Sequence, residues 1–266
     1  NNYFVAVGDA GTLFTAPYSY TSVGGVTGWS QATTPVGTAT DLSAVLYNGS
    51  QFVVLGRDGS VISSSDQINW ITRTAIGGAP LMNGLAYANG RGYVAVGANG
   101  AIYRNSSGSV TDGWTAMSSG TSQDLYGVSY VNGLFVAVGA AGTLLTSADG
   151  ITWTAQTSNT NSSLRHVAYG AGTYVVVGDA GAVVSSADAA VWTSQAIPTT
   201  ESFYSICFGP DLQFIAVGTT GTLAYSTTGL DGSWSVANAT SLDLYSIAPG
   251  NVFIAVGAAG TNVSGK

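Results

Sequence analysis

One short pattern recurs along the whole chain: an apolar segment ends in glycine, and two residues separate that glycine from a second one. The seven copies read FVAVGDAG, FVVLGRDG, YVAVGANG, FVAVGAAG, YVVVGDAG, FIAVGTTG and FIAVGAAG. Their first glycines are separated by 48, 41, 42, 39, 40 and 39 residues. A period of about 40 residues fits four short strands with their turns. The chain is therefore predicted to be a repeat of small antiparallel sheets.

The fourth copy shows how each unit is predicted to fold. Strands are expected at 125–130, 135–138 and 143–146 and around Trp153. A two-residue turn is expected inside Gly139-Ala-Ala-Gly142, with both glycines present because they supply positive φ. The second strand is apolar at consecutive positions, which indicates that both of its faces are covered. The stacked blades of a β-propeller cover their strands in this way.

The number of strands of each type predicts seven blades. The second-strand pattern occurs seven times, whereas the first-strand pattern and the closing tryptophan each occur six times. We therefore predict an all-β, seven-bladed β-propeller of four-stranded repeats whose first and last blades are incomplete. The alternative is a six-bladed ring in which the hairpins at 4–14 and 253–263 share one place.

The predicted boundaries follow from the same pattern. One β-propeller domain is expected over residues 1–266, with blades at approximately 1–35, 36–76, 77–120, 121–159, 160–198, 199–239 and 240–266. The fourth strands are expected to carry Trp29, Trp70, Trp114, Trp153, Trp192 and Trp234.

Three units carry the pattern S-x-D-x-x-x-W, with Asp66, Asp149 and Asp188 at its centre. This pattern resembles a shortened Asp-box, the BNR repeat signature in the propellers of sialidases, sortilin-type receptors and photosystem II assembly factors. It is one residue shorter than S-x-D-x-G-x-x-W. Each Asp is expected to accept hydrogen bonds from backbone N–H groups two or three residues on, while the Trp packs between blades. The resemblance implies that these turns lie away from a ligand-binding face.

Charge and hydropathy exclude two classes of partner. The chain has 13 acidic residues against 6 basic ones and a formal net charge of −7, which disfavours binding to nucleic acid. No apolar run reaches the length of about 18 residues that a membrane-spanning helix needs, so no membrane insertion is expected. The N-terminal region has no basic segment followed by an apolar run, so no signal peptide is expected.

Residues for catalysis are sparse. The sialidase resemblance implies a cluster of three arginines, a Tyr–Glu pair and a separate acid, of which only Glu201 and Tyr204 stand close together. The five arginines are predicted on different strands and turns of different blades: Arg57, Arg73, Arg91, Arg104 and Arg165. A glycosidic carboxylate pair stays open, because three carboxylates precede predicted first strands: Asp124, Glu201 and Asp243.

Metal and thiol chemistry have little support in the sequence. His166 is the only histidine and Cys207 the only cysteine, too few for a closed zinc site. Cys207 lies in an apolar run and is predicted to be a buried hydrophobic residue. We therefore predict no enzyme activity, no catalytic residue, no metal site and no cofactor.

One position of the repeat is a candidate for binding. The residue after the opening apolar position of each first strand is expected near one mouth of the central channel: Ser43, Asn83, Tyr126, Arg165, Tyr204 and Tyr245. Of these, Tyr126, Arg165, Tyr204 and Tyr245 are predicted to form a rim that binds a glycan or a peptide, because tyrosine offers an apolar face and a hydroxyl. The alternative is that the tyrosines pack between blades.

These features predict a non-enzymatic binding or adhesion module that is extracellular or lies on the cell surface. Its ligand is expected to be a glycan or a protein or peptide, held at the loop face. One alternative is a structural subunit of a surface assembly or filament, with self-assembly or strand exchange at the seam where the strands at 4–7 and 261–264 lack neighbours. Another is a glycoside-acting hydrolase of the sialidase-like type.

Overall fold

The G-x-x-G pattern forms the turn between second and third strands in a computed structural model of the chain, which describes residues 3–17, 28–209 and 211–265. In the fourth repeat Ala141 and Gly142 have φ of 51° and 71°, and the Thr143 N–H donates to the Ala140 carbonyl at 3.0 Å. Five such turns contain a short 3₁₀ segment: η1 (Ala98–Gly100), η2 (Ala140–Gly142), η3 (Asp179–Gly181), η4 (Thr219–Gly221) and η5 (Ala258–Gly260).

The positive φ predicted for both glycines is right for the second and wrong for the first. Gly139 has φ of −167°, an extended conformation that any residue adopts. The first glycine has a different reason, which is the close approach of another backbone segment. A Cβ on Gly178 would overlap the carbonyl oxygen of Ser163, and one on Gly218 would overlap that of Ser202. In these blades, and likewise at Gly97 and Gly257, the first glycine of the pattern therefore makes room for the chain that enters the first strand.

The strands follow the repeat. First strands are β4 (Leu42–Tyr47), β8 (Met82–Ala88), β12 (Leu125–Val131), β16 (Leu164–Gly170), β20 (Phe203–Phe208) and β24 (Leu244–Ala248). Second strands are β1 (Tyr3–Val7), β5 (Phe52–Gly56), β9 (Gly92–Gly97), β13 (Leu134–Gly139), β17 (Thr173–Gly178), β21 (Phe214–Gly218) and β25 (Phe253–Gly257). Third strands are β2 (Leu13–Pro17), β6 (Val61–Ser64), β10 (Ile102–Asn105), β14 (Leu144–Ser147), β18 (Val183–Ser186), β22 (Thr222–Ser226) and β26 (Asn262–Gly265). Fourth strands are β3 (Ser30–Gln31), β7 (Ile71–Thr72), β11 (Thr115–Met117), β15 (Thr154–Ala155), β19 (Thr193–Ser194) and β23 (Ser235–Asn238).

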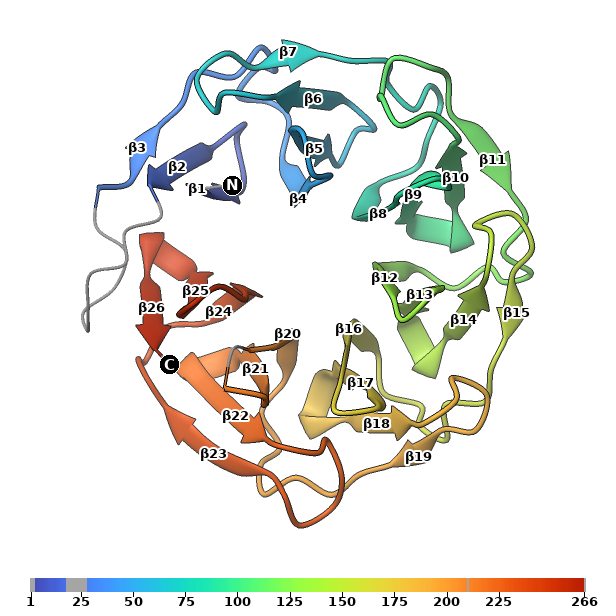
Figure 1. Ribbon diagram of the computed structural model, residues 1–266, viewed down its shortest axis with the longest axis vertical. Coiled ribbons are helices and arrows are strands. Elements are labelled where there is room, and N and C mark those ends of the chain that lie inside the picture. The colour runs from blue at the N-terminus through green and yellow to red at the C-terminus, as the bar shows by residue number, and fades with distance from the viewer. Residues whose placement is uncertain (1–2, 18–27, 210, 266) are drawn as a thin grey trace. The chain divides into compact units, whose positions relative to one another are not determined.

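These strands form seven sheets in which neighbours along the chain are neighbours in the sheet (Figure 1). Five sheets have four strands, and the first and last have three, in the orders β1-β2-β3 and β24-β25-β26. The fold is the predicted all-β, seven-bladed β-propeller with incomplete first and last blades. The six-bladed alternative is wrong, because the two terminal hairpins belong to separate sheets. No helix in the described residues has the length and apolar character needed to cross a bilayer.

The six tryptophans were predicted on the fourth strands, but they lie one residue before them. Each of them immediately precedes its fourth strand, as Trp70 precedes β7 and Trp192 precedes β19. In three blades the indole packs on the aromatic residue of the second strand, with ring centroids 6.1–6.4 Å apart: Tyr93 with Trp114, Phe135 with Trp153 and Tyr174 with Trp192. Trp70 also belongs to a buried cluster that joins the first and second blades and includes Leu13 and Phe52. The indoles therefore anchor the short outer strands to the core.

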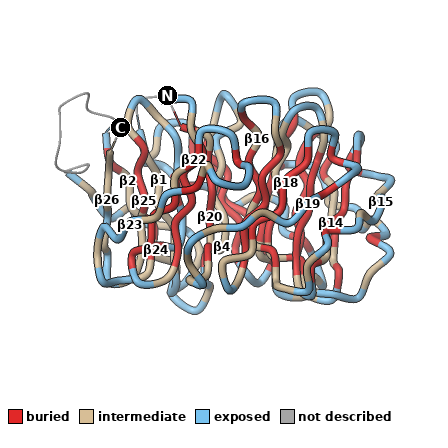
Figure 2. Tube along the Cα trace, turned by 90° about the horizontal axis from the view of Figure 1, so that it is seen from below, coloured by how far each residue is buried: buried red, intermediate tan, exposed pale blue. Residues whose placement is uncertain are grey.

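The chain divides into two compact units, one comprising 1–19, 27–137 and 147–154 and the other 20–26, 138–146 and 155–266. The single domain over residues 1–266 stays a prediction. Within the first unit every residue of β9 is buried, as the consecutive apolar pattern predicted. Within the second unit Val175, Phe203 and Phe214 belong to a core between the fifth and sixth blades. In both units buried residues occupy the strand interiors and exposed residues lie in the turns (Figure 2).

Candidate ligand-binding surface

The predicted binding positions of the second unit coincide with β-bulges. Pairing of β16 with β17 shifts between Leu164 and His166, which leaves Arg165 as the extra residue. The same shift leaves Tyr204 as the extra residue in β20 and Tyr245 in β24. A bulge bends its strand and re-aims the side chain of the extra residue. Arg165, Tyr204 and Tyr245 are therefore set apart from the regular alternation of their strands.

The equivalent positions of the first unit have different surroundings. Ser43 and Asn83 are also bulge residues. The Ser43 hydroxyl donates to the Leu55 carbonyl at 3.2 Å, and the Asn83 amide donates to the Leu125 carbonyl at 2.8 Å. These two side chains thus bind nearby backbone. Tyr126 follows Leu125 in β12. It belongs to the first unit, so the structure groups only the other three predicted residues within one unit.

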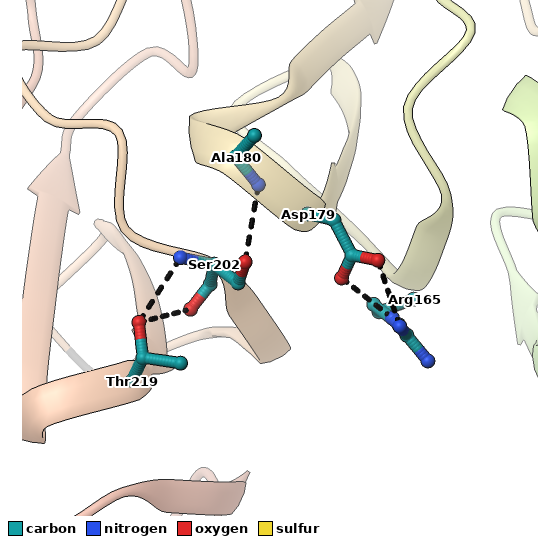
Figure 3. Close-up of polar contacts among 5 residues, drawn as sticks. All are labelled: Arg165, Asp179, Ala180, Ser202 and Thr219. Atoms are coloured by element: carbon teal, nitrogen blue, oxygen red, sulfur yellow. Dashed lines mark hydrogen bonds and ion pairs between the residues drawn. The ribbon is translucent and has the colours of Figure 1, made fainter.

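Arg165 forms an ion pair with Asp179, the first residue of η3. Its Nε donates to Oδ1 at 2.8 Å and a terminal nitrogen donates to Oδ2 at 2.7 Å (Figure 3). Both side chains are about two-thirds buried, with exposures of 29% and 32%. Paired N–H···O bonds of this kind fix the planes of both groups. The pair therefore holds the guanidinium in one orientation and neutralises its charge.

Tyr204 and Tyr245 form an aromatic pair. Their ring centroids lie 5.5 Å apart with a tilt of 52°, and Tyr245 is 53% exposed. Burial raises the pKa of Tyr204, and the negative charge of Asp243 raises it further. The Tyr204 hydroxyl therefore keeps its proton at neutral pH and is available as a donor. The two rings offer an accessible apolar surface beside the Asp243 carboxylate.

Side chains just ahead of the first strands hold the turn of the preceding blade. Each accepts a hydrogen bond from the residue of the G-x-x-G turn that has positive φ (Figure 3 shows the Ser202 case). The pairs are Ala10 to Asp41 at 3.0 Å, Asn99 to Asp124 at 2.8 Å, Ala180 to Ser202 at 3.1 Å and Thr220 to Asp243 at 2.9 Å. The sequence analysis did not predict these hydrogen bonds. The pattern that indicates them is a polar residue directly before the Leu or Phe that opens a first strand.

The three carboxylates considered for glycoside hydrolysis therefore accept hydrogen bonds that stabilise the fold. Asp124 and Asp243 accept the turn N–H groups, and Glu201 accepts a hydrogen bond from the Thr219 hydroxyl. Asp124 lies in the first unit and the other two lie in the second. Each of these three carboxylates has a structural partner within its own unit.

The arginines also have separate partners. Arg165 is the only arginine in the sequence of the second unit. In the first unit Arg91 donates to the Tyr130 hydroxyl at 2.9 Å, Arg104 donates to the Arg91 carbonyl at 2.8 Å, and Arg73 donates to the Ser63 hydroxyl at 2.7 Å. These contacts fix each guanidinium against its own local neighbour.

His166 and Cys207 lie in the packed strands of the second unit. The His166 Nδ1 lies 3.0 Å from the Ile206 carbonyl oxygen, and burial lowers the pKa of this imidazole. Cys207 is buried, as predicted, and burial raises the pKa of its thiol to about 12. The described residues contain no group of three or more His, Cys, Asp or Glu side chains that could hold a metal ion.

The three S-x-D loops share one geometry. Asp66 Oδ1 accepts from the Ile68 and Asn69 N–H groups at 3.0 and 2.8 Å. The equivalent bonds are 2.8 and 3.0 Å at Asp149 and 2.9 and 2.9 Å at Asp188. Backbone hydrogen bonds lower the pKa of all three carboxyls. The predicted local capping is confirmed, whereas membership of the Asp-box superfamily stays a prediction.

A fourth loop copies this arrangement without a carboxylate, and sequence reasoning missed it. Ser226 Oγ accepts from the Gly229 N–H at 2.7 Å, and Thr228 Oγ1 accepts from the Leu230 N–H at 3.3 Å. Threonine thus takes the place of the Asp. The S-x-T spacing ahead of Trp234 is the signal that could have revealed it.

Comparison with known proteins supports the fold. No family model matches the chain, and no curated protein matches its sequence. A solved structure of YCF48 from Cyanidioschyzon merolae is similar with a TM-score of 0.72 and 17% identity, covering 99% of this chain and 91% of that one. A structure of YCF48 bound to D1 peptide has a TM-score of 0.65 and 15% identity, covering 84% and 76%. The computationally designed Ika8 protein has a TM-score of 0.66 and 13% identity, covering 99% and 93%. At these identities the likeness shows a shared β-propeller fold.

Proposed function

We propose that this chain is a non-enzymatic binding module that holds a peptide on the surface formed by Arg165, Asp179, Tyr204, Asp243 and Tyr245, here called the bulge surface. One observation carries the proposal: three successive first strands of the second unit present Arg165, Tyr204 and Tyr245 at bulges. Bulges are enriched beside functional sites because they redirect side chains without disturbing the rest of the sheet. Tyr126 is proposed as a ligand contact of the first unit by its equivalent place in the repeat.

The chemistry of the bulge surface favours a peptide that is neutral or basic. It contains one guanidinium and two carboxylates, and the whole chain has a net charge of −7, so anionic ligands are repelled. The Tyr204–Tyr245 pair offers ring surface for apolar or cationic side chains and hydroxyls for peptide carbonyls. The structure of YCF48 bound to D1 peptide supports a peptide in preference to a glycan, because that protein has a similar fold.

An extracellular or cell-surface location is part of the proposal. It rests on composition: Lys and Glu each occur once, while Gly alone takes 37 positions and Ser, Thr and Asn fill the loops.

The test is a binding screen of this chain against two arrays, one of octapeptides of defined net charge and one of glycans. We expect neutral and basic peptides to bind and acidic peptides to fail. The double variant Tyr204→Ala/Tyr245→Ala should weaken the binding of the selected peptide at least about tenfold, as loss of a central aromatic contact does. Tyr47→Ala is the matched control, because Tyr47 is also an exposed tyrosine on a first strand, and its ring pairs with the ring of Phe52 on the neighbouring second strand.

Three results would contradict the proposal. Selective binding of glycans would show that the ligand is a sugar and not a peptide. Unchanged binding with a large loss of stability in the double variant would show that the tyrosines only pack. Turnover of fluorogenic glycosides that Asp243→Asn abolishes would show an enzyme.

A further inference from the structure

Two turns of the second unit hold Asp243 in place through its side chain and its backbone. Its Oδ1 accepts from the Thr220 N–H in η4 at 2.9 Å, and its carbonyl oxygen accepts from the Ala258 N–H in η5 at 2.9 Å. Its Oδ2 makes no hydrogen bond with the described residues. The fold therefore fixes the carboxylate and leaves one of its oxygens available to a donor.

The charge of Asp243 has no opposite charge beside it. Arg165, the only arginine in the sequence of this unit, forms its ion pair with Asp179. Asp243 makes no ion pair with any residue that the structure describes. With one guanidinium and two carboxylates, the bulge surface has a formal charge of −1, and Asp243 carries the part that is not neutralised.

Two tyrosine rings lie next to this carboxylate. Tyr245 follows Asp243 by two residues, and its ring centroid is 5.5 Å from that of Tyr204. Burial raises the pKa of Tyr204, and the charge of Asp243 raises it further, which places the carboxylate within electrostatic reach of that ring. The Tyr245 ring is 53% exposed. An oriented carboxylate and an accessible aromatic face therefore occur together at this point of the bulge surface.

This combination of groups recognises a cation. The face of a tyrosine ring attracts a cation that lies within about 6 Å of its centroid. A carboxylate oxygen beside the ring accepts a charge-assisted hydrogen bond from the same cation. An acidic side chain would be repelled by Asp243, and an apolar one would cover Oδ2 without supplying a donor. A guanidinium satisfies both partners, because it is planar, stacks on aromatic rings and donates from its edge.

We propose that Asp243, Tyr204 and Tyr245 form a subsite for a cationic side chain of the bound peptide, here called the cation subsite. The cation lies against the Tyr245 ring and donates to Asp243 Oδ2. This inference rests on the proposed function, because it names the side chain that the bulge surface selects. The two turns orient the carboxylate before a ligand arrives, so little ordering is needed on binding.

The probe is a capped octapeptide with one arginine, Gly-Ser-Ala-Arg-Ala-Ser-Gly-Ser, and the control peptide carries citrulline, which has the shape of arginine without its charge. NMR titration of the whole chain should show that the arginine peptide binds at least about tenfold more tightly. Asp243→Asn keeps an acceptor for the Thr220 N–H and removes the charge. It should weaken the arginine peptide at least about fivefold and leave the citrulline peptide unchanged.

Asp41→Asn is the matched control variant. Asp41 also accepts a turn N–H, from Ala10 at 3.0 Å, but the residue two positions after it is Ser43 and not a tyrosine. This variant should bind both peptides as the parent chain does. Any effect of Asp243→Asn that Asp41→Asn lacks therefore belongs to the cation subsite and not to the loss of an acidic residue at a turn.

Titration of Tyr204, followed by NMR of the tyrosine Cζ carbons, locates the cation independently. A positive charge beside Tyr204 stabilises its phenolate, so the saturating arginine peptide should lower the pKa of Tyr204, whereas the citrulline peptide should not. Equal affinity of the two peptides would overturn the cation subsite, and so would a preference for arginine that Asp243→Asn leaves intact. The proposed function would still stand in both cases if peptides of the array bind and Tyr204→Ala/Tyr245→Ala weakens them. Failure of every peptide to bind would overturn both proposals.

Discussion

The Ser64 hydroxyl makes several hydrogen bonds in the Asp66 loop, so replacing it tests whether these bonds stabilise the turn between the third and fourth strands. It accepts from the Gln67 N–H at 2.8 Å and from the Asp66 N–H at 3.3 Å, and it donates to Asp66 Oδ1 at 2.9 Å. Ser64 is only 2% exposed. We predict that Ser64→Ala destabilises the chain, and that Ser65→Ala, one residue along on the exposed side of the same loop, does not.

The size of the expected loss of stability depends on the hydrogen-bond donors that lose their partner when the hydroxyl is removed. Removing a buried acceptor costs about 1–3 kcal/mol when its donor stays unsatisfied, and an ordinary hydrogen bond contributes about 0.5–1.5 kcal/mol. The Gln67 N–H is the donor with the short bond, and its residue is partly exposed, so water recovers part of the loss. We therefore expect Ser64→Ala to lower the free energy of unfolding by about 1–2 kcal/mol. Ser65→Ala should change it by less than about 0.5 kcal/mol.

Urea unfolding followed by tryptophan fluorescence measures both variants, because Trp70 closes the same loop. The expected shift for Ser64→Ala is a lower midpoint with an unchanged slope, and a decrease in Tm of about 2–8 °C. Hydrogen exchange should show faster exchange at the Gln67 amide than in the parent chain. Equal stability of the two variants would refute the view that this hydroxyl holds the turn.

Three further predictions concern the loops and the core. Gln67 has φ of 64° where the equivalent Gly150 has 73°, so Gln67→Gly should relieve strain and raise the free energy of unfolding by about 0.5–1 kcal/mol, whereas Gly150→Gln should lower it, both measured by urea titration. Cys207, with its thiol pKa raised to about 12 by burial, should resist alkylation by iodoacetamide at pH 8 in the native chain and react once urea unfolds it. The lowered carboxyl pKa values of the S-x-D loops contribute stability that is present above the unfolded value near 3.8 and lost as the pH falls below it. Acid titration should therefore show a shallower loss of stability when Asn replaces all three carboxylates: Asp66, Asp149 and Asp188.

The fold could be predicted from sequence because its determinants are local and repeated. Each hairpin turn needs a residue with positive φ, and Gly142 marks that place in the fourth blade. The count of strand patterns then gave the number of blades and their incomplete ends. The exact start of each fourth strand was harder to predict. Trp153 lies one residue ahead of β15 and not on it. The fourth strands are only two to four residues long, and each of them begins directly after its tryptophan.

The site could be predicted only in part. The repeat brought Arg165, Tyr204 and Tyr245 to one equivalent position, but the bulges depend on a one-residue shift in pairing that no local pattern encodes. The partner of Arg165 was missed for a related reason. Asp179 lies 14 residues away, in the turn of the same blade, and only the strand register shows that the two side chains meet.

The distribution of hydrogen-bonding capacity favours the bulge surface over the acidic loops as the proposed ligand site. Asp66 uses both of its carboxylate oxygens within its own loop: Oδ1 accepts from two backbone N–H groups and from a serine hydroxyl, and Oδ2 accepts from the Asn69 side-chain amide, so little acceptor capacity is left for a ligand. Tyr204 and Tyr245 differ, because their hydroxyls make no hydrogen bond with the described residues and the Tyr245 ring is half exposed. Polar groups that the fold does not use are the ones that a partner can bind at least cost.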